Sequence, residues 1–171
     1  MDKNNNSETY SNGVKFYRAG RLVGFDELVE ELIAYIKEKP EREYKIVVGS
    51  DSRAEKEVRF ITSVAILRVG NGGRYYWTRS EETYAPTLRD RIYKETMHSI
   101  LCTQELRSRL KDKLGEEFFW DGKISVHIDV GENGPTKDLI DTVVGMVKGY
   151  GFEAVIKPDS FGAFVLADRH T

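Results

Sequence analysis

The stretch "KISVHIDVGENGPTKDLIDTVVGMVKGYGFEAVIK", residues 123–157, decides the fold because it reads as a strand, a helix and a second strand. Apolar and polar residues alternate over 123–130, apolar residues recur at helical spacing within 134–151, and 153–157 is again typical of a strand. Two strands joined through a helix are expected to be parallel neighbours in one sheet.

Asp129 interrupts the first of these strands at its carboxyl end, just before the chain turns at Gly131. Alternation places its carboxylate on the same face of the strand as His127. In sheets with parallel strands, ligands bind beyond the carboxyl ends of the strands. Asp129 is therefore a candidate functional residue.

The sequence before this stretch predicts a helix, three strands and a long helix. The expected ranges are 25–39 for the helix, 43–52, 58–69 and 73–81 for the strands, and 87–114 for the long helix. The Gly-Asn-Gly-Gly turn at 70–73 predicts an antiparallel hairpin, placed at the edge of the sheet opposite the parallel pair. A short terminal helix is expected over 160–171. The fold class is α/β, a mixed five-stranded sheet of order βββαβαβα with flanking helices and an extra N-terminal helix.

Length and composition favour one domain. The chain has 171 residues, 40% of them hydrophobic, which suits a single core over 21–171 preceded by a flexible tail of residues 1–20. One cysteine cannot form an internal disulfide, and no apolar run reaches the roughly 18 residues of a membrane helix. A cytoplasmic protein is expected, with no membrane partner. Oligomeric state is left open.

Net charge gives no sign of a general affinity for nucleic acid. The chain has 26 Lys and Arg against 28 Asp and Glu, a formal net charge of -2. Binding to nucleic acid would therefore depend on a local patch of positive charge.

Three further acids share the unusual placement of Asp129. Asp51 ends the first predicted strand, and Asp168 falls on the inward stripe of the predicted terminal helix. Glu95 lies in the middle of an apolar stripe on the long helix, which is made of Leu88, Ile92, Ser99, Cys102, Leu106 and Leu110.

Each acid also has a purely structural explanation. Asp51 can cap a turn through Ser52, Glu95 can pair with an arginine, Asp129 can brace the Gly131 turn, and Asp168 can belong to a frayed terminus. As a group the four acids are harder to explain in this way, because two carboxylates about 4 Å apart repel by about 4 kcal/mol at an effective dielectric of about 20. A cation must offset this repulsion, and all-oxygen ligands suit Mg²⁺ or Mn²⁺ better than zinc.

Several longer stretches of the chain carry a family resemblance. They are "VGSDS", "RIYKETMHSI", "VHIDVGENGPTKDLI", "VVGMVKGYGF" and "IKPDSFGAFVLADRHT". As a set they resemble the predicted ribonuclease H-like proteins of the YkuK type, a bacterial family once classed as a domain of unknown function. The resemblance runs from about Val14 to the last residue. This chain differs from ribonuclease H by a helix before the first strand.

The resemblance implies a site and a mechanism. By position, Asp51, Glu95, Asp129 and Asp168 correspond to the four carboxylates of the ribonuclease H superfamily, which makes all four both catalytic and metal-binding candidates. It further implies two Mg²⁺ or Mn²⁺ ions about 3.5 to 4 Å apart that activate water and stabilise the leaving oxygen in phosphodiester hydrolysis. The implied partner is nucleic acid: RNA, an RNA:DNA hybrid or structured DNA.

Weaker candidates for substrate binding are Lys157, Asn133 and His170. Lys157 follows the fifth strand on the edge expected to hold the site, where it can contact phosphate or simply be solvated. Asn133 can orient substrate or permit a tight turn, and His170 lies two residues beyond Asp168.

Three function classes are compatible with these features. The first is a metal-dependent nuclease, and the alternative is a non-catalytic nucleic-acid-binding module on a ribonuclease H-like scaffold. The third is a phosphate or nucleotide binder with an acid cluster like that of receiver domains. The opening run of three strands argues against the third, because receiver domains alternate strand and helix from the start.

Overall fold

The computed structural model describes residue 10 and residues 13–115 and 123–160. Its strands and helices follow one another as β1 (Lys15–Arg18), β2 (Arg21–Gly24), α1 (Phe25–Glu38), β3 (Tyr44–Asp51), β4 (Glu57–Val58), β5 (Ile61–Arg68), β6 (Gly73–Arg79), β7 (Thr83–Tyr84), α2 (Leu88–Leu114), β8 (Ile124–His127), a 3-10 turn (Lys137–Leu139), α3 (Ile140–Gly149) and β9 (Glu153–Val155).

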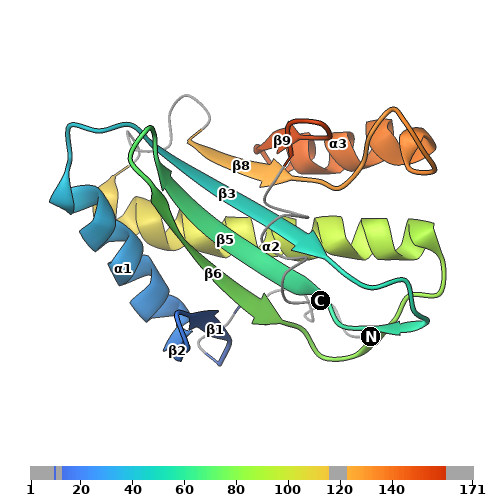
Figure 1. The fold of residues 1–171 in the computed structure, drawn as a ribbon, viewed down its shortest axis with the longest axis horizontal. Coiled ribbons are helices and arrows are strands. Elements are labelled where there is room, and N and C mark those ends of the chain that lie inside the picture. The colour runs from blue at the N-terminus through green and yellow to red at the C-terminus, as the bar shows by residue number, and fades with distance from the viewer. Residues whose placement is uncertain (1–9, 11–12, 116–122, 161–171) are drawn as a thin grey trace.

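Seven strands form a mixed sheet in the order β2-β1-β6-β5-β3-β8-β9 (Figure 1). β5 and β6 are antiparallel, as the glycine-rich turn predicts, and β8 and β9 are parallel neighbours joined through α3. β3 lies between β5 and β8, antiparallel to the first and parallel to the second. The predicted strands are thus confirmed, and β3 is an interior strand that joins the antiparallel and parallel parts of the sheet.

The sheet differs from the prediction at its β6 side. The predicted five strands are extended by β1 and β2, so the β5–β6 hairpin does not form the edge. The segment predicted as a tail over 1–20 includes β1, where Phe16 is fully buried against the first core. The sequence signal for this pair of strands was an apolar residue on each side of a tight turn, Phe16 and Val23, which pair with each other in the structure. The tail and the single domain over 21–171 otherwise stay predictions.

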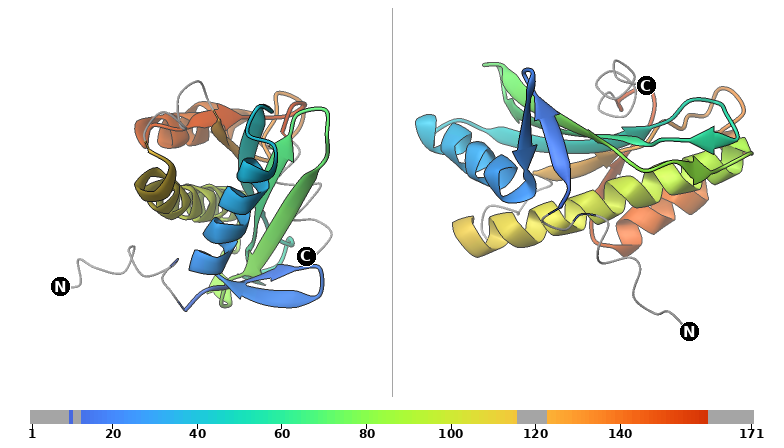
Figure 2. Two further views of the ribbon diagram at one scale, coloured as in Figure 1. Left: turned by 90° about the vertical axis from the view of Figure 1, so that its left-hand side faces the viewer. Right: turned by 90° about the horizontal axis from the view of Figure 1, so that it is seen from below.

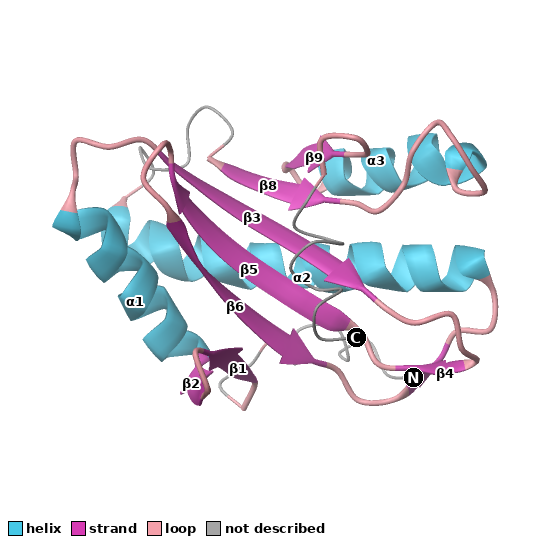
Figure 3. Ribbon diagram, viewed as in Figure 1, coloured by secondary structure: helices cyan, strands magenta, loops and turns pink. Residues whose placement is uncertain are grey.

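Helices α1, α2 and α3 lie on one face of the sheet (Figure 2). One core cluster joins α1 and the first half of the chain to the second half of α2, through residues such as Leu28, Ile46 and Leu106. A second cluster packs β8 against α3 and the first half of α2, through Val126 and Val143 among others. The long helix α2 therefore connects both halves of the core (Figure 3).

The buried side of α2 follows the predicted stripe. A capping box begins the helix, because Thr87 accepts from the backbone N–H of Asp90 while the Asp90 side chain accepts from the N–H of Thr87. Glu95 is only 6% exposed, so the sequence correctly placed this acid on the inward face. A buried carboxyl in this position must be hydrogen-bonded or paired to be tolerated.

Two smaller elements complete the described structure. β4 and β7 form a short antiparallel pair of two residues each. The sequence prediction placed Val58 at the start of a longer strand and gave no strand at Thr83–Tyr84. The predicted terminal helix over 160–171 falls almost entirely outside the described residues. Within the described part of the chain, no helix has the length and apolar character needed to cross a membrane.

Candidate functional site

Asp51 is the last residue of β3, at the carboxyl end of an interior strand. Its neighbour Ser50 faces α2, because the Ser50 hydroxyl lies 2.9 Å from the hydroxyl of Ser99. Alternation therefore directs Asp51 toward the opposite face of the sheet. Its side chain is partly exposed, as a ligand-binding acid requires.

Asp129 lies two residues beyond the end of β8, the strand parallel to β3. Ile128 and Val130 belong to the core cluster under α2 and α3, so Asp129 also points toward the opposite face. Parallel pairing brings the carboxyl ends of β3 and β8 to the same edge of the sheet. The two aspartates therefore end adjacent strands at one place, as the sequence predicted.

Glu95 reaches this edge from α2, on the other side of the sheet. Ser52, one residue after Asp51, turns back toward α2 and donates a hydrogen bond of 2.6 Å from its hydroxyl to Oε1 of Glu95. The hydrogen-bond partner of Glu95 is thus a serine hydroxyl, whereas its structural explanation from the sequence had been pairing with an arginine. The hydrogen bond ties the end of β3 to the helix that carries the third acid.

The pKa of Glu95 responds to the two aspartates. Burial and the negative charges of Asp51 and Asp129 together raise the pKa of Glu95 to about 8, against the hydrogen bond from Ser52 and the charge of Arg91, which lower it. Desolvation is the largest of these causes. Without a cation nearby, Glu95 therefore holds a proton at neutral pH.

Asp129 has a cationic neighbour in Lys157. The Lys157 ammonium nitrogen lies 2.6 Å from Oδ1 of Asp129. The backbone N–H of Lys157 donates to the carbonyl of Val130 at 2.9 Å, so the segments after β8 and β9 continue the pairing of these two strands. Gly131 allows this approach, because a Cβ there would lie 3.0 Å from Cβ of Lys157.

The turn at Gly131 is supported by Thr136. The Gly131 N–H donates to the hydroxyl of Thr136 at 3.1 Å, so a threonine from the following turn braces it. The ion pair with Lys157 is a further structural explanation for Asp129.

The donor chemistry of this edge suits a hard divalent cation better than a soft one. Asp51, Glu95, Asp129 and the hydroxyl of Ser52 offer only oxygen atoms, which are the preferred ligands of Mg²⁺ and Mn²⁺. Their arrangement does not yet form a coordination shell: within residues 10, 13–115 and 123–160, no three His, Cys, Asp or Glu side chains are placed to hold a metal ion. The geometric reason is that Glu95 approaches from the helix face, whereas the aspartates occupy the other face.

Of the remaining predicted site residues, two lie within the described part of the chain and two lie outside it. Asn133 is exposed in the loop after β8, and Lys157 contacts the site directly. Asp168 and His170 lie outside the described residues, so their predicted roles stay predictions. His127 lies on the same strand face as Asp129 and is buried; burial lowers its pKa to about 4, so it is neutral at pH 7.

A row of buried hydroxyls crosses the space between the sheet and α2 beside Glu95. Ser99, one turn after Glu95, donates to Ser50, whose hydroxyl lies 2.8 Å from that of Thr62. The hydroxyl of Tyr10 donates to Thr62 at 3.0 Å and lies 3.4 Å from Nδ1 of His98. These contacts connect the N-terminal part of the chain to the centre of the sheet.

Sequence reasoning missed Ser52 as a partner of Glu95. The available signal was its position directly after Asp51, where strand alternation returns the side chain to the helix face. Arg91 lies four residues before Glu95, one helical turn away, which was the available signal for its effect on this acid. Both residues adjust the charge of the buried acid.

Comparison with known proteins assigns the chain to a family. Residues 27–171 match the family described as "Ribonuclease H-like". The chain is 32% identical over 160 residues to the "Uncharacterized protein YkuK" of Bacillus subtilis (strain 168), which covers 86% of this chain and 90% of that protein. No solved structure matches the chain. The chain therefore belongs to the ribonuclease H-like family.

Proposed function

We propose that this protein is a divalent-metal-dependent nuclease that hydrolyses phosphodiester bonds in nucleic acid. One observation carries the proposal: Asp51, Glu95 and Asp129 come from β3, α2 and the loop after β8 to one edge of the sheet, with Glu95 almost fully buried there. A buried carboxyl flanked by two others is costly to the fold. A site that holds cations would justify that cost.

In this proposal Asp51 and Asp129 provide the main ligands for Mg²⁺ or Mn²⁺, and Glu95 and the predicted Asp168 complete the set. The bound ions would supply positive charge that lowers the pKa of a water molecule and stabilises the leaving oxygen. Ser52 orients the Glu95 carboxyl through its hydrogen bond. In the proposal Lys157, which contacts Asp129, binds a phosphate of the substrate.

The test is an assay of metal-dependent cleavage. The purified protein is incubated with labelled single-stranded RNA, an RNA:DNA hybrid, duplex DNA and branched DNA, with Mg²⁺, Mn²⁺ or a chelator. Cleavage of at least one substrate that stops in the chelator is expected. Binding to a nucleic acid without such cleavage would instead favour the non-catalytic binding module.

A further inference from the structure

A pocket of about 730 Å³ lies beside β1 and β6, outside the carboxylate edge described above. Its walls include Tyr17 and Leu22 from the β1–β2 pair, Arg79 from the end of β6, and His98 from α2. None of these residues has a role in the proposed hydrolysis. The pocket therefore needs its own explanation.

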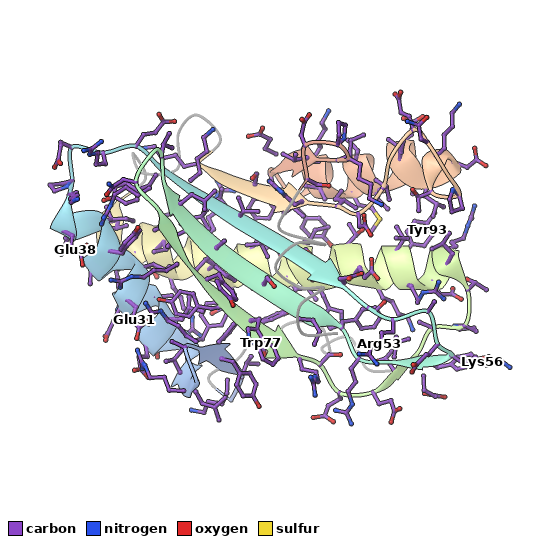
Figure 4. All side chains as sticks on the ribbon, in the orientation of Figure 1. Glu31, Glu38, Arg53, Lys56, Trp77 and Tyr93 are labelled. Atoms are coloured by element: carbon purple, nitrogen blue, oxygen red, sulfur yellow. The ribbon has the colours of Figure 1, made fainter. Side chains whose placement is uncertain are left out.

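An exposed aromatic surface forms one side of this pocket. Tyr17 stacks on Trp77 of β6, with ring centroids 4.4 Å apart and ring planes inclined by 17°. Tyr17 is 41% exposed and Leu22, its partner across the β1–β2 pair, is 53% exposed. Neighbouring large apolar side chains that are exposed to water often mark a binding surface. Figure 4 shows Trp77 near the end of β6, beside β1 and β2.

Positive charge surrounds the aromatic surface. Among the charged residues that line the pocket, Lys15, Arg59 and Arg79 are cationic and Glu81 is anionic. The chain as a whole has a net charge of -2, so this excess is local. The Arg79 guanidinium also lies 5.8 Å from the ring centroid of Trp77. Aromatic rings beside cations are the elements with which proteins bind single-stranded nucleic acid, through base stacking and phosphate contacts.

The register of the sheet connects the pocket to the acids. Arg79 pairs with Ile61, and Ile61 pairs with Asp51, so the three residues form one row across β6, β5 and β3. Two strand spacings, about 10 Å, therefore separate the backbone of Arg79 from that of Asp51. Alternation places both side chains on the same face of the sheet. A strand of nucleic acid with a phosphate at the acids can reach the pocket along this row.

We propose that the pocket beside β1 and β6 binds single-stranded nucleic acid, with a base stacked on the exposed face of Tyr17 and phosphates contacted by Lys15, Arg59 and Arg79. The inference rests on the proposed nuclease function and specifies its substrate class as one with an unpaired strand beside the cleavage site. A base in a duplex has both faces covered by its neighbours. Duplexes are therefore expected to use this surface poorly.

The test measures binding of a fluorescent oligouridine by anisotropy, in Mg²⁺, to protein that carries Asp51→Asn to prevent cleavage. In that background Tyr17→Val removes the ring but keeps a residue suited to a strand, and Tyr17→Phe keeps the ring. Tyr150→Val, at a tyrosine that is 44% exposed after α3, is the matched control. Loss of one stacked base is worth about 1 to 3 kcal/mol, so Tyr17→Val should weaken binding about fivefold to a hundredfold.

Tyr17→Phe and Tyr150→Val should bind within about twofold of the Asp51→Asn parent, and duplex RNA should bind equally to all variants. Arg79→Gln should make the slope of log affinity against log salt concentration less steep by about one, as expected for the loss of one phosphate contact. The inference is wrong if Tyr17→Val, folded as judged by its melting temperature, binds oligouridine like the parent, or if the parent itself does not bind. If the panel assay shows cleavage but Tyr17→Val binds oligouridine like the parent, the binding role of the pocket is wrong and the nuclease function stands. If Tyr17→Val weakens binding but no substrate is cleaved, the nuclease function is wrong and the binding role stands.

Discussion

The ammonium of Lys157 lies 2.6 Å from the carboxylate of Asp129, so the acid after β8 is paired with a cation supplied by the chain. Lys157 is 44% exposed, and an ion pair at such a position contributes about 0 to 1 kcal/mol to stability. The pair thus contributes little to the stability of the fold. The Lys157 ammonium occupies a carboxylate oxygen of Asp129 that a metal ion would also use.

Replacing Lys157 should strengthen the binding of divalent ions. In Lys157→Met the ammonium no longer competes for Asp129, so Mg²⁺ and Mn²⁺ should raise the melting temperature at lower concentrations than in the parent. The measurement is thermal unfolding against metal concentration without nucleic acid. Asp129→Asn should lose most of the response. A weaker metal response in Lys157→Met would mean that the lysine supports the cation site.

Substitution of the acids should abolish cleavage. Asp51→Asn, Glu95→Gln and Asp129→Asn each keep the shape of the side chain but replace a carboxyl that can bind a metal ion as a carboxylate with a neutral amide. When residues act together as a unit, removal of any one of them abolishes most of the activity. Each variant should reduce cleavage of the preferred substrate by at least about a hundredfold, while binding persists. Asp141→Asn, at an exposed aspartate of α3, is the control. Cleavage that survives in Asp129→Asn would contradict the proposed mechanism.

His98 should make stability depend on pH in the acidic range. Burial lowers the pKa of His98 to about 4 in the folded protein, whereas the unfolded chain has the usual value of about 6.5. The unfolded state then binds more protons between these values, so the free energy of unfolding rises with pH from about 4 to 6.5. The contribution of His98 to stability is lost as the pH falls through this range.

The variant that isolates this effect is His98→Phe, which keeps a ring to stack against Phe60. Denaturation by urea at pH 4.5 and 7 should show a smaller pH difference in the variant, by on the order of 1 to 3 kcal/mol. His127 has a pKa lowered in the same direction by burial, so some dependence should remain. An identical pH difference in parent and variant would show that His98 titrates normally in the folded state.

The hydroxyl of Thr62 should stabilise the fold through its hydrogen bonds with Tyr10 and Ser50. Thr62→Val keeps the shape of the side chain but removes the acceptor of Tyr10 and the partner of Ser50. Unsatisfied buried hydroxyls cost about 1 to 3 kcal/mol, which urea denaturation should detect. Thr83→Val, whose hydroxyl makes only a long contact of 3.4 Å, should change stability much less. Equal stability of the two variants would show that the row of hydroxyls contributes little.

The sequence alone determined the central strands, the hairpin, the parallel pair and the inward face of α2. These features follow from local rules, because glycine-rich turns, strand alternation and helical spacing depend on residues close together in the chain. The burial of Glu95 was predictable for the same reason: its position within an apolar stripe leaves it no other direction. The strand-end positions of Asp51 and Asp129 were equally accessible.

Only the tertiary structure decided the partners of these acids and the extent of the sheet. The hydrogen bond from Ser52 to Glu95 spans 43 residues, and whether it forms depends on how the end of β3 packs against α2. β1 and β2 are four residues each, too short to be stable alone, and they become strands because β6 offers an unpaired edge and the core accepts Phe16. Local spacing cannot specify such contacts, since their free energy arises only when distant segments are brought together.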